Sequence, residues 1–342
     1  MKKFIIFIIS IFMLTACGSV DGENIKKDFT DKVSNLDSYS IVGRMKIISD
    51  EEVFNYNIDV NFLKDNNYKV KLLNVSNNHE QVILRNSSGV YVITPSINKS
   101  YKFESSWPDN SSQSYLLKSV LKDINYDKKS KVTKSKSGYI IKTKVNYPNN
   151  ENLSYEKIYL DKDANVTKVV VYDSDNKKRI ETIFDKIDYK TNLKEDSFKI
   201  DDYIKKMDEN KENKCEGEDC SKNTANLLDD IIYPLYLPSN TYLTSSEKID
   251  SENGKRVILT FEGDKSFTIV EETLSIPKEF EINPVFGDPI LLNDTLGVME
   301  DNSIRWNKAG VSYYLTSNTL SGSEMVSVAS SMNEAKSVLG SK

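Results

Sequence analysis

The segment 54–62 alternates apolar and polar side chains without a break. A period of two residues predicts a β-strand with one face in a core and one face in water. The apolar members are Phe54, Tyr56, Ile58, Val60 and Phe62. Segments of strand length, separated by Gly, Pro, Asn or Asp, lie on both sides of it: 39–49, 68–75, 81–86, 90–94, 100–104, 131–136, 139–147, 154–160, 166–172 and 179–189. These spacings predict a long antiparallel sheet that curls.

Two helices are expected to accompany this sheet. Apolar residues recur every three or four positions from Ile25 to Leu36, which is typical of an amphipathic helix. Trp107 and Pro108 then interrupt the strands, and Ser111 or Ser112 is expected to cap a helix that runs to Ile124. The fold class predicted for residues 23–205 is therefore α+β, mainly β, with helices covering the concave side of a curved sheet.

Residues 229–342 predict a second, smaller α+β domain. Strand patterns occupy 242–249, 256–262, 266–273, 291–299, 303–307 and 311–317, with a break at 284–289. Ser321 and Glu324 form a capping-box pattern, and Met325, Val328 and Met332 follow at helical spacing. That apolar stripe is expected to pack in the core, with a groove for a partner as the alternative.

The first residues read as a lipoprotein signal peptide over 1–16. Lys2 and Lys3 precede an apolar run from Phe4 to Leu14, which is too short to span a bilayer. Cys17 follows Leu-Thr-Ala, a pattern similar to the bacterial lipobox, so we expect a diacylglycerol on Cys17, a lipidated tether over 17–22, and a location at the extracytoplasmic face of the cell membrane. The alternatives are a permanent transmembrane anchor and an ordinary secretory signal.

The charge and the cysteines limit the function classes. A formal net charge of −5 gives no electrostatic reason to expect a nucleic acid partner. The charged segment 206–228 reads as a solvated linker. Its Cys215 and Cys220 are expected to form a disulfide, because they lie outside the cytoplasm. The alternative is a metal site, but two cysteine ligands without a second pair are fewer than a structural zinc site uses.

The sequence gives no catalytic site. It contains no nucleophile-elbow, phosphate-loop or metal-ligand helix motif, and its one histidine, His79, lies in a polar turn that is expected at the surface. We therefore expect a protein that is not an enzyme and that holds no cofactor or metal.

Several motifs resemble the LolA-type family of lipoprotein-sorting proteins, and its sporulation branch of YdcC-like and GerS-like lipoproteins most of all. They are the strand-turn-strand 82–95, Trp107-Pro108 with 113–117, Asp123-Ile124, and 191–193 followed by Phe198. The second domain resembles a small module that accompanies membrane-bound anti-sigma factors, through 261–270 and 306–317.

The resemblance implies a half-open antiparallel barrel under helices, and a binding function. The first hypothesis is a lipoprotein of spore-forming bacteria that docks a cell-wall amidase or another envelope protein during spore envelope or cortex formation or germination. The alternatives are a carrier of lipid or acyl chains in a hydrophobic cavity, and a stress-sensing regulator of an anti-sigma factor. The candidate cavity or interface residues are Phe54, Tyr56, Ile58, Val60, Phe62, Trp107, Tyr115 and Leu116; core filling explains the β-strand members equally well.

Overall fold

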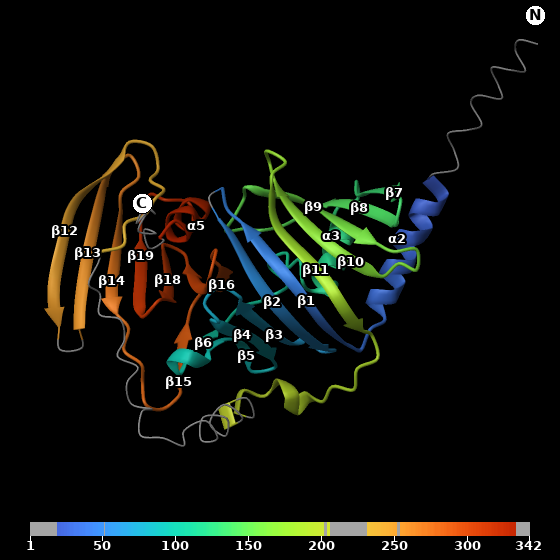
Figure 1. Ribbon diagram of the computed structural model, residues 1–342, viewed down its shortest axis with the longest axis horizontal. Coiled ribbons are helices and arrows are strands. Elements are labelled where there is room, and N and C mark those ends of the chain that lie inside the picture. Colours follow the sequence, from blue (N-terminus) through green and yellow to red (C-terminus); the bar gives the residue numbers. More distant parts are fainter. Residues whose placement is uncertain (1–18, 51, 202–203, 206–230, 252–253, 333–342) are drawn as a thin grey trace, which may run out of the picture. The chain divides into compact units, whose positions relative to one another are not determined.

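The structure is a computed structural model that describes residues 19–50, 52–201, 204–205, 231–251 and 254–332 (Figure 1). The expected lipidation site Cys17, the pair Cys215 and Cys220, the signal peptide and the linker 206–228 lie outside the described residues. The described chain is mainly antiparallel β-sheet with few helices, which confirms the predicted fold class.

The chain divides into two compact units whose bounds cross the expected domains. The first comprises 1–60, 108–147 and 152–192, and the second comprises 61–107, 148–151 and 193–342. The expected boundaries, 23–205 and 229–342, stay a prediction about the organisation of the sequence.

The first unit contains two helices and strands of the larger sheet. Its elements are α2 (Ser19–Ser34), β1 (Ser38–Ile48), most of β2 (Val53–Leu63), α3 (Leu117–Tyr126), β7 (Lys131–Ser135), β8 (Gly138–Lys144), β9 (Leu153–Leu160), β10 (Val166–Asp173) and β11 (Lys178–Asp188). Helix α2 begins at Ser19, so residues 19–22 of the expected lipidated tether are helical, and the tether itself stays a prediction.

The two helices of this unit are joined at their ends. Ile25, Phe29 and Val33 of α2 are buried, as their spacing predicts. The Lys118 ammonium of α3 donates to the carbonyl oxygens of Val33 (2.8 Å) and Ser34 (3.1 Å). The Val33 carbonyl also accepts from the Leu36 backbone N–H (3.3 Å). The Ser34 carbonyl ends α2, where no intrahelical donor remains, so Lys118 satisfies a group that would otherwise need water.

Helix α3 begins later than the sequence predicts. Its N-cap is Leu116, which makes no side-chain capping bond. The Ser112 hydroxyl instead accepts a hydrogen bond from the Asn146 backbone N–H (2.8 Å) and donates to the Asp123 carboxylate (2.9 Å). Ser112 is therefore committed to a tertiary contact, which competes with the local capping role that its side chain would otherwise take.

The second unit contains the remaining strands and the C-terminal helix. Its elements are β3 (Asn67–Asn74), β4 (Glu80–Asn86), β5 (Gly89–Thr94), η1 (Pro95–Ile97), β6 (Lys99–Phe103), η2 (Glu195–Phe198), β12 (Thr241–Ser251), β13 (Gly254–Gly263), β14 (Phe267–Thr273), β15 (Glu281–Val285), β16 (Asp288–Leu291), β17 (Leu296–Glu300), β18 (Ser303–Lys308), β19 (Val311–Thr316) and α5 (Gly322–Ser330).

The strands form two sheets, both open. The larger has the order β15-β6-β5-β4-β3-β2-β1-β11-β10-β9-β8-β7, and the smaller has the order β12-β13-β14-β19-β18-β17-β16. β15 was missed in the sequence, where 284–289 was read as a break. It pairs in parallel with β6, so its partner lies about 180 residues away in the chain and leaves no local signal. The segment 291–299, expected as one strand, is divided between β16 and β17.

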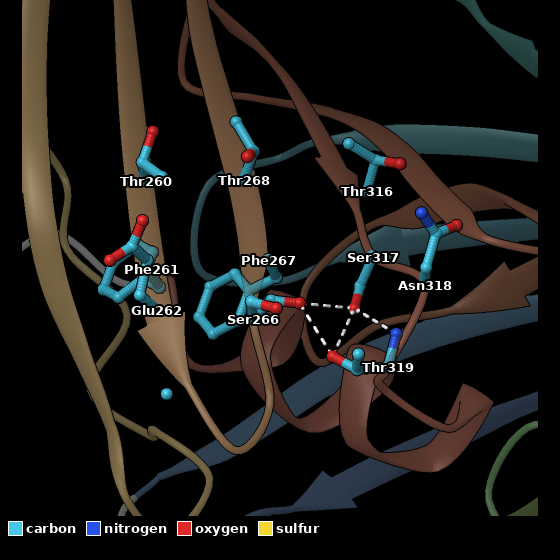
Figure 2. A pocket seen from close by; sticks show the side chains of 11 residues that line it. Thr260, Phe261, Glu262, Ser266, Phe267, Thr268, Thr316, Ser317, Asn318 and Thr319 are labelled. Atoms are coloured by element: carbon cyan, nitrogen blue, oxygen red, sulfur yellow. Dashed lines mark hydrogen bonds between the residues drawn. The ribbon is translucent and has the colours of Figure 1, made fainter.

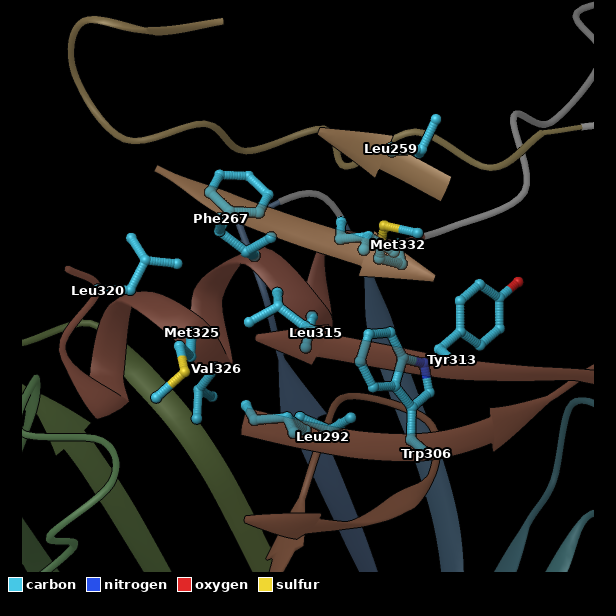
Figure 3. Packing of buried hydrophobic residues seen from close by; sticks show 14 of the residues in the cluster. Leu259, Phe267, Leu292, Trp306, Tyr313, Leu315, Leu320, Met325, Val326 and Met332 are labelled. Atoms are coloured by element: carbon cyan, nitrogen blue, oxygen red, sulfur yellow. The ribbon is translucent and has the colours of Figure 1, made fainter. Parts of the chain in front are cut away.

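One core of the second unit lies between the smaller sheet and α5 (Figure 3). A separate buried cluster of this unit consists of Val82, Leu84, Tyr91, Ile93 and Phe198. Trp306 and Tyr313 are cross-strand neighbours whose rings stack with centroids 5.0 Å apart. Met325, Val328 and Met332 face this sheet and are buried, which confirms core packing of the C-terminal helix. The predicted capping box is also confirmed, because Ser321 accepts from the Glu324 N–H while Glu324 accepts from the Ser321 N–H.

Gln81 connects β4 to the turn before β17 within this unit. Its side-chain oxygen accepts from the Leu296 N–H (2.6 Å) and the Thr295 hydroxyl (3.2 Å), and its amide donates to the Thr94 hydroxyl (3.2 Å). Gln81 is 6% exposed, so water cannot replace these bonds without rearrangement. Residues 61–107 and the second half of the chain therefore share one polar contact deep in the unit.

A Gln81→Leu substitution should lower the free energy of unfolding by about 2 kcal/mol, because the Leu296 N–H would remain buried without an acceptor. Chemical denaturation followed by tryptophan fluorescence measures this. The matched control is Asn318→Leu, which removes an exposed amide that accepts from the exposed Asn302 side chain. A loss no larger for Gln81→Leu than for the control would contradict the structural role of Gln81.

Candidate functional site

The predicted cavity residues are all buried. In the first unit these are Phe54, Tyr56, Ile58 and Val60 on the inner face of β2, together with Tyr115 and Leu116 before α3; in the second unit they are Phe62 and Trp107. The Trp107 ring lies edge-on to Tyr68 with centroids 6.0 Å apart. Burial of this kind is what core residues show, and the assignment of these residues to a cavity or an interface stays a prediction.

The most unusual chemistry of the first unit is a buried pair of carboxyl groups. Asp123 lies on the inner side of α3 and is 6% exposed, and Glu156 lies on the inner face of β9 and is fully buried. Thr143 is the cross-strand neighbour of Glu156, and its hydroxyl donates to the Asp123 carbonyl (3.0 Å). The helix and the sheet thus bring the two acids into one enclosed polar layer.

The hydrogen bonds of this pair are incomplete. The Asp123 Oδ1 atom accepts from Ser112, but its Oδ2 atom and both oxygens of Glu156 have no hydrogen-bond partner among the described residues. An ionised carboxylate in such a place is strongly disfavoured. Burial raises the pKa of Asp123 to about 7, and burial together with the nearby Asp123 charge raises the pKa of Glu156 well above its usual range. Both shifts favour the protonated form of the carboxyl group over the carboxylate.

The position of the Asp123–Glu156 pair favours a structural role over a catalytic one. Two carboxyl groups that push each other's pKa apart can divide the roles of acid and base, as in several hydrolases. A glycosidase pair must stand on both sides of an accessible bond. Asp123 and Glu156 are enclosed between α3 and the sheet, so a substrate bond does not reach them in this arrangement.

The sequence analysis named Asp123 only as part of a family motif and did not name Glu156, although a signal for a buried acid exists at each position. Glu156 is in phase with Ile158 and Leu160 on a strand, and Asp123 stands three residues after Val120 on a helix whose stripe is buried. A charged residue in the apolar phase of an element indicates a buried ionisable group.

A further buried acid lies in the other unit. Glu271 of β14 is fully buried, and its Oε2 atom accepts from the Ile232 backbone N–H (3.2 Å), while Oε1 has no partner among the described residues. Burial raises its pKa to about 7. Glu271 thereby attaches residues 231–232 to the core cluster, against which Ile231 and Ile232 pack.

His79 is more enclosed than its turn sequence predicts. The side chain is half-buried, and its Nε2 atom is enclosed without a hydrogen-bond partner among the described residues. Burial lowers the pKa of His79, and the nearby Asp294 carboxylate opposes this only in part. The expectation of a surface histidine is therefore wrong, because tertiary packing of the second unit covers a turn that is polar in sequence.

The second unit also has a polar hollow of about 480 Å³ near the β13–β14 hairpin (Figure 2). Hydroxyl groups line much of it, but they bond to one another and to the backbone: Ser317 donates to the Ser266 carbonyl (2.7 Å), and Thr319 does the same (2.9 Å). This arrangement fixes the loop 317–319 and leaves few free donors for a ligand.

Strand β12 forms an exposed edge of the smaller sheet. Tyr242, Leu243 and Ile249 are 59%, 39% and 43% exposed. Leu243 pairs with the buried Phe261, so it stands on the core face of the sheet and yet remains uncovered. The preceding segment adds Tyr233, Leu235, Tyr236 and Leu237, all of them exposed. An exposed edge with apolar side chains is typical of a surface that accepts another strand.

Two further properties of the described residues bear on function. No group of three or more His, Cys, Asp or Glu side chains is placed to hold a metal ion within the described ranges. None of the helices in the described part of the chain has both the length and the apolar character needed to cross a bilayer.

Comparison with known proteins places the chain in a family. The family "Sporulation protein YdcC-like" matches residues 1–198. Sporulation protein YdcC of Bacillus subtilis (strain 168) is 34% identical over 335 residues, which cover 97% of both chains. The chain belongs to the family of YdcC-like sporulation proteins, which confirms the sporulation branch of the resemblance found in the sequence.

Solved structures give weaker likenesses. The complex of Pseudomonas aeruginosa MucA and MucB has a chain that is 13% identical, with a TM-score of 0.32, covering 90% of this chain and 97% of that chain. A chain in the structure of the Clostridioides difficile CwlD amidase in complex with the GerS lipoprotein is 19% identical, with a TM-score of 0.31. The match covers 49% of the present chain and 95% of that chain. Similarity at this level carries no argument about a partner.

Proposed function

We propose that this chain is an extracytoplasmic lipoprotein, anchored through Cys17, that acts without catalysis by docking a cell-wall amidase or another envelope protein during spore envelope or cortex formation or germination. Membership of a sporulation family supports the setting. The observation that carries the docking role is the exposed apolar edge of β12.

The geometry favours an extended protein segment as the occupant of this edge. An edge strand presents unpaired backbone N–H and C=O groups along its length, which a strand of another protein can satisfy. Tyr242 and Leu243 stand on opposite faces of the sheet, so an added strand would find apolar contacts on both. A lipid would leave the backbone groups of the edge unpaired.

A Leu243→Asp variant should weaken binding of the partner by at least about tenfold, because the charge would be buried beside the incoming strand. The partner is identified by cross-linking the full-length protein in sporulating cells, then purified, and its affinity is measured by titration with the wild type and the variant. Tyr126→Asp is the matched control, because Tyr126 is 80% exposed in the first unit and far from β12 in the chain.

Equal affinity of the Leu243→Asp variant and the wild type would contradict docking at β12. Native mass spectrometry of the protein lacking residues 1–17 distinguishes the docking hypothesis from the carrier hypothesis. A lipid retained by the purified protein would favour the carrier hypothesis.

A further inference from the structure

The outward face of β7 to β10 carries a basic and aromatic surface that the acidic composition of the chain conceals. These strands lie side by side in the first unit (Figure 1). We call this surface the Lys–Tyr face. It consists of Lys131, Lys142, Lys144, Lys157, Lys168, Tyr155, Tyr159 and Tyr172. It lies on the side of the sheet opposite to Glu156 and Thr143, whose side chains are buried.

Strand register places three lysines in one row. Lys131 pairs with Lys142, and Lys142 pairs with Lys157, so like charges stand directly opposite each other on three neighbouring strands. Neighbouring strands are about 4.8 Å apart. Like charges in directly opposite positions are destabilising. Because the row lowers the stability of the fold, we infer that it has a binding role.

Three of the five lysines of this face, Lys142, Lys157 and Lys168, lie over tyrosine rings. The ammonium of Lys142 lies 3.7 Å from the centroid of the Tyr155 ring, and that of Lys168 lies 4.2 Å from the Tyr159 centroid. None of the five lysines forms a salt bridge with a carboxylate of the described residues. Glu181 continues the row on β11, and its charge is shared with Lys178 at 3.6 Å. The positive charge of the face is thus largely uncompensated.

The ring faces are already occupied, which narrows the choice of ligand. Tyr155 and Tyr172 stack on each other with centroids 4.8 Å apart, and the Lys157 ammonium stands 5.0 Å from the Tyr172 centroid. Nucleic acid bases need free ring faces for stacking. Insertion into a bilayer needs protruding apolar side chains. The register places Ile140 and Val170 on the same side of the sheet, but Ile140 is half-buried and Val170 is fully buried, so neither protrudes.

We propose that the Lys–Tyr face binds an acidic polysaccharide, a polymer whose repeating sugars carry carboxylate or phosphate groups. The row of ammonium groups matches a row of anions. The Tyr155 hydroxyl donates to the Asn176 side chain (3.0 Å), and its oxygen can still accept a hydrogen bond from a sugar hydroxyl. This site is separate from β12 and does not depend on the docking function proposed above.

Titration of the full-length protein with a fluorescein-labelled oligomer of galacturonic acid tests the proposal. We expect saturable binding that weakens as salt rises, since exposed charges are screened. The double variant Lys142→Glu with Lys157→Glu should lose at least about tenfold in affinity. The variant Lys142→Gln with Lys157→Gln should lose less, because it removes the charges without reversing them.

The control is Lys248→Glu with Lys278→Glu, which changes the net charge equally at exposed positions elsewhere. It should keep the wild-type affinity within about twofold if binding is local, because distant exposed charges are screened. Absence of binding, or an equal loss in the control, would overturn the proposal. Stronger competition by single-stranded DNA or by phosphatidylglycerol vesicles than by unlabelled oligomer would overturn it in favour of those ligands.

Discussion

A Glu156→Gln variant is expected to unfold with a free energy about 2 kcal/mol higher than the wild type at pH 8, and with nearly the same free energy at pH 4. The amide cannot ionise, and its N–H groups can donate to the Asp123 oxygen that now has no partner. Urea denaturation of both proteins at a series of pH values measures the difference.

The sign follows from the raised pKa values. Asp123 has a pKa of about 7 in the folded protein against an ordinary value of 3.8, so the folded state binds more protons than the unfolded state between these values. Its stability contribution is complete below the unfolded pKa and is lost as pH rises through about 7. Glu156 acts in the same direction.

Two comparisons isolate the effect of the pair. Glu271 also has a pKa raised to about 7, so the wild type carries a second contribution of the same sign, which cancels when variant and wild type are compared. Glu181→Gln is the matched control, because Glu181 stands on the outward face of the same sheet beside Lys178. A pH profile of Glu156→Gln parallel to that of the wild type would show that the pair is not a proton-sharing unit.

Cys17→Ala should abolish incorporation of labelled palmitate and reduce the membrane-bound fraction by at least about a hundredfold. A buried acyl chain contributes about 0.8 kcal/mol per methylene group, and a chain with net charge −5 gains little from anionic lipid. The measurement is metabolic labelling followed by separation of membranes from the extracellular fraction.

Cys215→Ala is the control for this experiment, because it removes a thiol from the same chain without touching the lipobox pattern. It should keep both the label and the membrane fraction. A Cys17→Ala variant that still incorporates palmitate, or that remains with the membranes, would show that another group holds the protein there.

Local patterns predicted most elements correctly. The alternation over 54–62 reappears as β2, whose inner side chains are buried one after another. The capping box at Ser321 and the stripe of α5 appear where the sequence places them. These features depend on residues within a few positions of each other, so a pattern can reveal them.

Errors occurred where a distant partner decides the structure. Ser112 bonds with Asn146 and Asp123 instead of capping α3. β15 exists because β6 offers it an edge, and His79 is half-buried because its own unit packs over the turn. The predicted lipidation of Cys17 differs from these cases, because it depends only on the residues directly around Cys17 and on no distant partner.

The sequence by itself determined the mainly-β class, the phases of the strands and the family, because periodicity and motifs are local properties of the chain. Tertiary structure alone decided which strands became neighbours. Register placed Lys131, Lys142 and Lys157 in one row, and packing of α3 on β8, the strand beside β9, enclosed Asp123 with Glu156. Charges that are spread evenly along a chain are concentrated only when strands pair, because pairing brings together residues that no sequence window contains.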